Sequence, residues 1–132
     1  MSYRKPHVLF QRRAVANKMK GEISVNDTLS GLYEIITQRK ANPMEGSYTC
    51  YLFEKGLDKI LKKCGEECAE TIIAAKNGDN SETVLEISDL VYHLMVMMVE
   101  QGIKLEDVMA ELETRRQKQG NLKVFHKTDK NT

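Results

Sequence analysis

The segment LVYHLMVMMV, residues 90–99, most restricts how this chain can fold. It lies in the second half of a helix predicted from about Glu82 to Gln101, with Ser81 as the N-cap and Gly102 after the end. Because the segment is apolar on nearly every side, it must be buried at the centre of a helical bundle or in a subunit interface. One short chain can hardly cover such a helix alone. The sequence therefore predicts an all-α bundle of four to five helices that is completed by dimerisation.

The other helices are predicted from apolar residues that recur every three or four positions. The first helix is expected to begin with Asp27 as its cap and to end before Pro43. Ser47 or Thr49 is expected to cap a short helical turn, which Gly56 breaks. The residues of the first helix that are expected to face the core are Leu29, Leu32, Ile35 and Ile36.

A longer helix is predicted from Leu57 to Lys76, followed by the polar turn 77–80, and a last helix from Leu105 to Lys118. The short connections favour antiparallel neighbours. The long helix is expected to face the core with Leu57, Leu61, Cys64, Cys68, Ile72 and Ala75, and the last helix with Leu105, Val108, Met109 and Leu112.

The length of 132 residues suits one domain, which we place at residues 27–118, between a basic arm (1–26) and a polar tail (119–132). Residues 1–20 carry six Lys and Arg and no acidic residue, and residues 115–132 carry six and a single acid. Basic arms of this kind bind nucleic acid, attract a polyphosphate ligand, or are simply solvated. The charge pattern alone leaves these alternatives open.

No apolar run approaches the roughly 18 residues of a membrane span. The N-terminal residues also lack the apolar core of a secretory signal. We therefore expect a cytoplasmic protein without a membrane partner. The three cysteines, Cys50, Cys64 and Cys68, contain no CxxC pair, so small buried side chains are favoured over a zinc site.

Two acidic pairs, Glu67 with Glu70 and Glu86 with Asp89, have the three-residue spacing that places both members on one helix face. Two antiparallel helices would bring all four carboxylates together. Like charges at this spacing destabilise a helix, which suggests that a cation lies between them. An all-oxygen ligand set favours Mg²⁺, and hence chemistry at phosphorus. The alternative is an exposed acidic face that pairs with Lys59, Lys62 and Lys63.

These acidic motifs resemble those of a known enzyme family. The run KKCGEECAE (62–70), followed by EISDLVYHLMVMM (86–98), is similar to the phosphoribosyl-ATP pyrophosphohydrolases of histidine biosynthesis. It also resembles the wider all-α nucleoside triphosphate pyrophosphohydrolases, whose pattern is EExxE, a spacer and ExxD. The loop GSYTCYLFEKG (46–56) resembles the SYT segment of the histidine enzymes. The resemblance covers about residues 29–116.

The resemblance implies a dimer of intertwined helices that hydrolyses phosphoribosyl-ATP to phosphoribosyl-AMP and pyrophosphate with Mg²⁺. It implies that the metal ligands are Glu67, Glu70, Glu86 and Asp89. Glu66 matches the first acid of EExxE. Either Glu66 or Glu67 is expected to take the proton of the attacking water.

Lys63 is expected either to stabilise the leaving pyrophosphate or to form salt bridges with the glutamates three and four residues later. Tyr48, Thr49, His93 and Arg115 are further candidates for substrate contact. For three of them an alternative stays open. Thr49 would cap a helix, His93 would pair with the aspartate four residues before it, and Arg115 would only contribute to solubility.

Two other functions compete with this interpretation. The first is hydrolysis of ordinary or damaged nucleoside triphosphates by the same fold, which the carboxylates alone cannot distinguish. The second is a non-catalytic dimerisation module with nucleic-acid-binding arms, which would show strongly salt-dependent nucleic-acid binding. We favour a nucleotide substrate and no nucleic-acid partner, because the second alternative leaves the acidic pairs unexplained.

Overall fold

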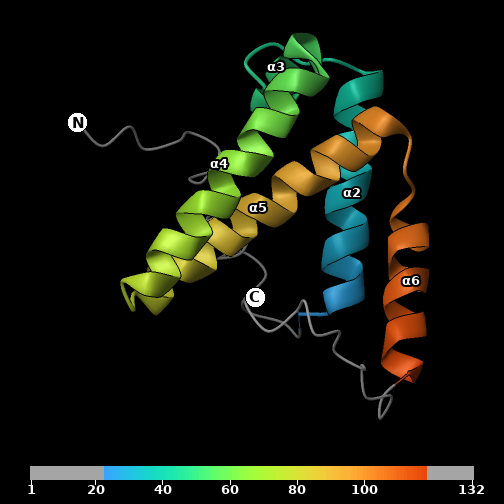
Figure 1. Ribbon diagram of the computed structural model, residues 1–132. Coiled ribbons are helices and arrows are strands. Elements are labelled where there is room, and N and C mark those ends of the chain that lie inside the picture. The colour runs from blue at the N-terminus through green and yellow to red at the C-terminus, as the bar shows by residue number, and fades with distance from the viewer. Residues whose placement is uncertain (1–22, 119–132) are drawn as a thin grey trace, which may run out of the picture.

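The computed structural model describes residues 23–118, and this part of the chain contains helices and no strand (Figure 1). The helices are α2 (Val25–Ala41), α3 (Tyr48–Lys55), α4 (Leu57–Lys76), α5 (Asn80–Gln101) and α6 (Leu105–Gln117). The prediction of an all-α fold is confirmed. The tail 119–132 and residues 1–22 of the expected basic arm lie outside the described residues.

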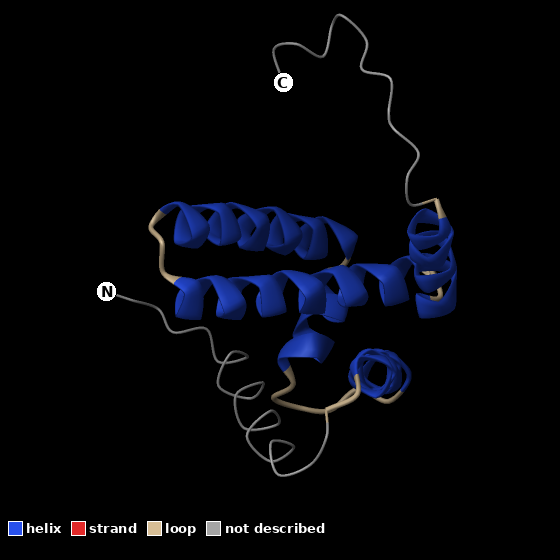
Figure 2. Ribbon diagram, turned by 90° about the horizontal axis from the view of Figure 1, so that it is seen from below, coloured by secondary structure: helices blue, strands red, loops and turns tan. Residues whose placement is uncertain are grey.

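The hairpin of α4 and α5 is the scaffold of the fold. The two helices run antiparallel and lie side by side in both views (Figures 1 and 2). The turn between them contains Gly78, whose φ of 72° is accessible to glycine at little cost. Short α3 contacts α2, α4 and α5, and α2 crosses α5 near its C-terminal end, whereas α6 follows α5 after a loop and runs away from it. None of these helices is both long and apolar enough to span a membrane.

The helix boundaries agree with the predicted ones except at two caps. Ser24 caps α2, so the helix begins before Asp27, which lies in its first turn. Asp79, rather than Ser81, caps α5 by accepting the backbone N–H three residues later at 3.0 Å. Ser47, one of the two predicted caps, begins α3. Several residues within one turn have cap chemistry, and the sequence does not rank them.

The second half of α5 forms the centre of the core, as predicted. Its Met95, Val96, Met98 and Val99 are all buried, although Leu94 is 37% exposed. Each of the other helices contributes one or more buried or half-buried side chains to this cluster. The fully or nearly fully buried partners are Ile36 from α2, Leu52 from α3, Ile60 from α4 and Leu105 from α6.

The buried face of α4 differs from the predicted one. Ile60, Glu67 and Ala74 are the residues of α4 that are buried. At 100° per residue, the centre of this face lies roughly 100° around the helix from the centre of the predicted apolar stripe. The flank that carries the acids therefore faces α5, and much of the apolar stripe is left outside the single chain. The residues of the predicted stripe that are exposed instead are Leu61, Cys68, Ile72 and Ala75.

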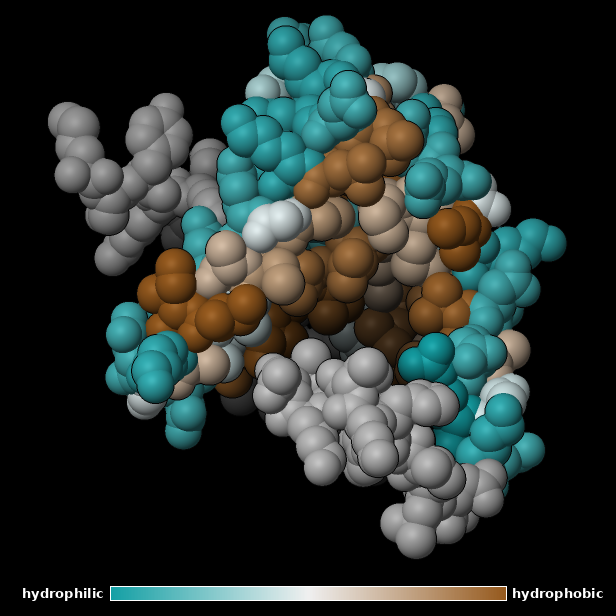
Figure 3. Space-filling view, in the orientation of Figure 1, coloured by the Kyte–Doolittle hydropathy of each residue, from teal (hydrophilic) through white to brown (hydrophobic). Residues whose placement is uncertain are grey.

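The last helix also differs from its predicted packing. Leu105 is buried and Met109 is half-buried against the core, but Val108 and Leu112 are exposed. Ile35 of α2, which was expected in the core, is 47% exposed. Figure 3 shows apolar side chains gathered in a hollow on one face of the molecule. The chain thus keeps apolar surface of the kind that marks an interaction site.

Shortening Ile60 by one methyl group tests the described core. Ile60 is fully buried, whereas Ile73 on the same helix is 58% exposed. We expect Ile60→Val to lower the free energy of unfolding by roughly 0.5–1.5 kcal/mol, because the substitution leaves a small cavity. The matched control Ile73→Val should change it by less than about 0.5 kcal/mol in the same urea titration. Equal effects of the two variants would contradict the described orientation of α4.

Candidate active site

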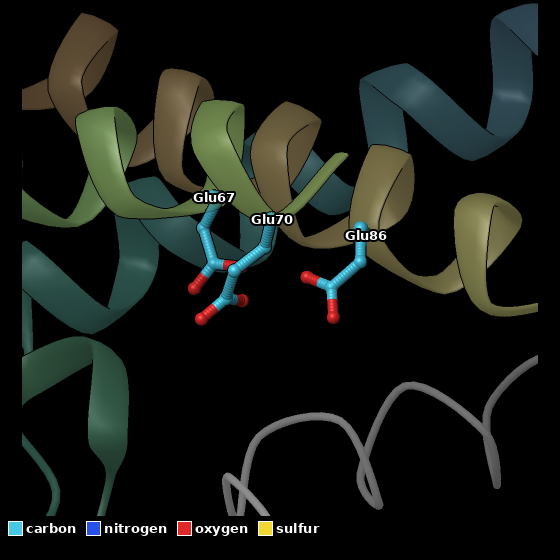
Figure 4. Close-up of side chains that lie close together, drawn as sticks. All are labelled: Glu67, Glu70 and Glu86. Atoms are coloured by element: carbon cyan, nitrogen blue, oxygen red, sulfur yellow. The ribbon is translucent and has the colours of Figure 1, made fainter. Parts of the chain in front are cut away.

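Three of the four predicted metal ligands converge between α4 and α5. Glu67 and Glu70 leave α4, Glu86 leaves α5, and their carboxylates point into the same space (Figure 4). Each offers an oxygen, and these oxygens all lie within 4.8 Å of one another. The convergence follows from the helical spacing of the acids and the antiparallel hairpin. It is the arrangement that the sequence predicted for these three residues.

The fourth predicted ligand, Asp89, is buried on the same helix as Glu86 but lies outside this group. Its side chain follows that of Glu86 by three residues on α5, and Asp89 is only 2% exposed. Glu67 is fully buried. Carboxylates are seldom buried to this extent unless they are paired or bind a metal. The position of Asp89 is thus compatible with its predicted role, which stays a prediction.

The carboxylates perturb one another strongly. Burial, hydrogen bonding to Glu70 and Glu67, and the negative charges of these two residues together raise the pKa of Glu86 from 4.5 to about 8. One buried oxygen of Glu86 has no hydrogen-bond donor among the described residues. In the metal-free protein, Glu86 therefore keeps its proton at neutral pH, because its surroundings do not stabilise a further negative charge.

The raised pKa of Glu86 predicts how the metal-free protein responds to pH. Between pH 4.5 and about 8, Glu86 holds a proton in the folded state but has released it in the unfolded state. The free energy of unfolding therefore falls as the pH rises through this range, and Glu86 has no such effect below pH 4.5. In the presence of EDTA, we expect Glu86→Gln to raise the thermal unfolding midpoint relative to wild type more at pH 8 than at pH 5. A difference that is constant over this range would contradict the perturbed pKa.

Lys63 lies beside the cluster and forms the salt bridges that were one of its two predicted roles. Its ammonium is 2.9 Å from a carboxylate oxygen of Glu66 and 3.6 Å from one of Glu67. The side chain of Glu66 is 42% exposed and that of Lys63 only 12%. Lys63 thus holds a positive charge at the edge of the cluster, and it fixes a solvent-accessible carboxylate next to a buried one.

The first two residues of α3 bond to two neighbouring residues of α5. The Tyr48 hydroxyl lies 3.1 Å from Nε2 of His93, whose Nδ1 lies 2.7 Å from the backbone oxygen of Asp89. Because a carbonyl only accepts, Nδ1 carries a proton, and when the ring is neutral Nε2 accepts the proton of the Tyr48 hydroxyl. The Thr49 hydroxyl bonds to that of Tyr92. These paired contacts fix α3 to α5 beside the cluster.

These contacts bear on the predicted roles of two residues. Thr49 neither caps α3 nor reaches solvent, because it is only 8% exposed and bonds to Tyr92. His93 is fully buried and contacts Tyr48, and its predicted contact with substrate stays a prediction. It contacts Asp89 through the backbone oxygen of that residue. Burial raises the pKa of Tyr48, and the charge of Glu67 adds to the shift, so its hydroxyl stays protonated and able to donate.

Arg115 lies outside this arrangement in the single chain. It is on the last turn of α6, which stands apart from the α4–α5 hairpin in Figure 1. The guanidinium donates to Glu111 on its own helix at 3.0 Å, and its side chain is 72% exposed. The structure therefore favours the surface role over substrate contact within one chain.

The cluster has the chemistry of a site for a hard divalent cation. It offers only carboxylate oxygens, and one oxygen of Glu86 is buried without a donor from the described part of the chain. A cation would offset the burial and the repulsion that together raise the pKa of Glu86. Mg²⁺ prefers such oxygen ligands and commonly completes its shell with water and substrate phosphates. The residues present therefore fit the Mg²⁺ that the family resemblance implies.

Sequence comparison adds an independent finding. The family model described as phosphoribosyl-ATP pyrophosphohydrolase matches residues 29–116. The chain belongs to this family. A protein of Clostridium botulinum named phosphoribosyl-ATP pyrophosphatase is 59% identical over 103 residues, which cover 78% of this chain and 94% of that protein. A Listeria innocua protein of the same name is 61% identical over 90 residues, or 68% of this chain and 86% of its own.

The family also includes a module of larger proteins. The histidine biosynthesis bifunctional protein HisIE of Thermoanaerobacter pseudethanolicus is 66% identical over 83 residues, which cover 63% of this chain but only 38% of that protein. The comparisons thereby confirm the resemblance to the phosphoribosyl-ATP pyrophosphohydrolases, which the EExxE and ExxD motifs and the SYT segment indicated.

Sequence reasoning missed a cleft next to these residues. The cleft has a volume of about 900 Å³ and lies between the end of α2, the following loop and α3. Tyr48 lines it, together with Arg39 and Lys40, which no motif had singled out. The only available signal was two adjacent basic residues at the end of a helix, which is common at helix C-termini.

Proposed function

We propose that this protein hydrolyses phosphoribosyl-ATP to phosphoribosyl-AMP and pyrophosphate in histidine biosynthesis. Water attacks one of the two phosphorus atoms of the α–β anhydride, the bond from that phosphorus to the bridging oxygen breaks, and phosphoribosyl-AMP and pyrophosphate separate. The observation that carries this proposal is the convergence of Glu67, Glu70 and Glu86 between α4 and α5 of a chain from this family. An acidic cluster cannot attract a triphosphate by itself, so the proposal requires a bound cation.

The cation that we propose is Mg²⁺, held by Glu67, Glu70 and Glu86 with Asp89 as a further ligand. When bound, Mg²⁺ would supply charge neutralisation and polarisation of phosphate oxygens. The fit of the donor set and the neutralisation of the cluster support this choice. The number of ions is left open.

The chain's own residues orient and activate the reactants. We assign proton acceptance from the attacking water to Glu66, because its carboxylate is accessible and Lys63 holds it next to the cluster at 2.9 Å. Lys63 also places positive charge where the pyrophosphate develops negative charge. Tyr48, whose hydroxyl His93 orients, lies at the edge of the site, where its ring can contact substrate.

We also propose that the protein is a homodimer. The predicted α4 stripe is exposed at Leu61 and Ile72, and α5 exposes Ile87 and Leu94 on one face at a spacing of seven residues. A second copy of the chain is the partner whose apolar helices match this surface. Dimerisation would bury the stripe, which sequence reasoning assigned to the core of a single chain.

Light scattering of the intact protein tests the dimer. At micromolar concentration we expect twice the mass of one chain, and Ile72→Lys should raise the dimer dissociation constant at least about tenfold, because it places a charge in the interface. The matched control Ile73→Lys lies on another side of α4 and should leave the mass unchanged. A monomeric wild-type protein would contradict the proposal.

Product analysis tests the proposed reaction. The protein is incubated with phosphoribosyl-ATP and Mg²⁺, and the products are separated by chromatography. We expect equimolar phosphoribosyl-AMP and pyrophosphate, and much slower hydrolysis of ATP, GTP and oxidised nucleotides. Preferential hydrolysis of ordinary or damaged triphosphates would instead support the other enzymatic function, which the carboxylates alone do not distinguish from this one.

A cytoplasmic location stays a prediction.

A further inference from the structure

The cleft beside the acidic cluster combines three kinds of groups. Arg39 and Lys40 provide positive charge from the end of α2, and Tyr48, Tyr51 and Phe53 provide aromatic rings from α3. Glutamate side chains also line the cleft, and carboxylates suit the hydroxyl groups of a sugar. With about 900 Å³ of space, the cleft is of the size that small-molecule sites have.

The positive charges of this cleft are available to a ligand. Among the described residues, no carboxylate lies within ion-pair distance of the Arg39 guanidinium. Lys40 pairs with Glu100 at 3.3 Å, and its ammonium lies 5.6 Å from the centre of the Phe53 ring. The side chains of this pair are 42% and 24% exposed, so the pair is weak and Lys40 can exchange it for a phosphate at little cost.

Tyr48 connects the cleft to the acidic cluster. Tyr48 lines the cleft, its hydroxyl lies 3.1 Å from His93, and the His93 ring in turn contacts the backbone oxygen of Asp89. Tyr48 is therefore the residue that the cleft shares with the surroundings of the carboxylates. The two regions together offer a site for a ligand with two separate anionic ends.

This inference rests on the proposed function, because phosphoribosyl-ATP has two such ends. Its triphosphate belongs at the carboxylates and their cation. Its second end, a ribose 5-phosphate attached to the adenine, is what distinguishes it from ATP. We propose that the cleft binds this ribose 5-phosphate, and that Arg39 and Lys40 bind its phosphate and so determine the specificity for phosphoribosyl-ATP. Arg39 suits the role, since a guanidinium binds phosphate through two parallel hydrogen bonds.

Product binding separates this subsite from the chemical step. Isothermal titration of phosphoribosyl-AMP and of AMP compares ligands that differ only in the ribose 5-phosphate. We expect wild type to bind phosphoribosyl-AMP roughly tenfold to hundredfold more tightly, the range for hydrogen bonds to a charged group. Arg39→Gln should remove most of this difference and leave AMP binding unchanged, and the more exposed Lys40→Gln should remove part of it.

Kinetics on phosphoribosyl-ATP give a second readout. We expect Arg39→Gln to raise KM by a similar factor with a smaller effect on kcat, and Arg39→Lys to restore part of the loss. Lys76→Gln removes a charge from the exposed end of α4 and should change neither quantity.

Two results would overturn the proposal. The first is equal affinity of the wild-type protein for phosphoribosyl-AMP and AMP, and the second is an equal loss of affinity for both ligands in Arg39→Gln. A wild-type protein that fails to hydrolyse phosphoribosyl-ATP would contradict the proposed function, and the binding comparison would still decide about the cleft.

Discussion

Glu67→Gln is expected to lower kcat by at least about hundredfold at saturating Mg²⁺. Glutamine keeps the shape of the side chain but removes the charge of the one member of the cluster that is fully buried. Even changes to groups that only support a metal ligand cost roughly tenfold to hundredfold in metal affinity or activity, so loss of a ligand should cost at least as much. The measurement is pyrophosphate release from phosphoribosyl-ATP over a series of Mg²⁺ concentrations.

A matched control separates this effect from a general change of charge. Glu106→Gln removes one negative charge from the exposed first turn of α6 and should leave kcat unchanged. Circular dichroism establishes that both variants are folded. Wild-type turnover in folded Glu67→Gln would remove this carboxylate from the mechanism. The same comparison with Asp89→Asn decides whether Asp89, which lies outside the group of converging oxygens, is a ligand.

His93→Ala is expected to cause the largest loss of stability, about 3 kcal/mol or more. The substitution empties a fully buried ring position, which for aromatic side chains costs roughly 3–5 kcal/mol, and it removes the ring nitrogen that lies 3.1 Å from the Tyr48 hydroxyl. Urea denaturation monitored by circular dichroism measures the free energy of unfolding. Tyr48→Phe removes only the hydroxyl and should cost roughly 1 kcal/mol.

A double-mutant cycle tests whether the two side chains act together. If the 3.1 Å contact holds α3 to α5, Tyr48→Phe should lower the free energy of unfolding clearly less in the His93→Ala protein than in wild type. Additive effects would mean that the contact contributes nothing. A change below about 1 kcal/mol in His93→Ala alone would contradict the buried position of the ring.

The elements with local signals could be predicted from the sequence. The end of α5 at Gly102 and the break at Gly56 follow from glycine chemistry, and both residues have positive φ. The convergence of Glu67, Glu70 and Glu86 follows from helical spacing and a short turn, which are also local properties. Local signals determine the position of a residue along a helix and around its axis.

The direction in which α4 faces could not be predicted. The apolar stripe that includes Leu61 and Ile72 was assigned to the core, but the core-facing side of α4 carries Glu67 instead. Apolar patterning shows that a face is buried and does not show whether its partner belongs to the same chain or to another. A buried carboxylate is unfavourable without a cation, so patterning alone assigns it to the surface.

Contacts between residues far apart in the sequence were also missed. Tyr48 and His93 lie 45 positions apart, and nothing local to Thr49 indicates that Tyr92 is its partner. The motif that contains Tyr48 and Thr49 suggested substrate contact for both, whereas the structure uses Thr49 for packing. Arg39 and Lys40 belong to no recognised pattern, and only the cleft between α2 and α3 draws attention to them.

A crystal structure of the protein with Mn²⁺ and a non-hydrolysable analogue of phosphoribosyl-ATP tests the central claim most directly. Mn²⁺ replaces Mg²⁺ at oxygen sites and is located by its anomalous scattering. We expect an anomalous peak between the carboxylates of Glu67, Glu70 and Glu86, in contact with the triphosphate. A triphosphate bound elsewhere, with these side chains directed into solvent and no metal between them, would contradict the account.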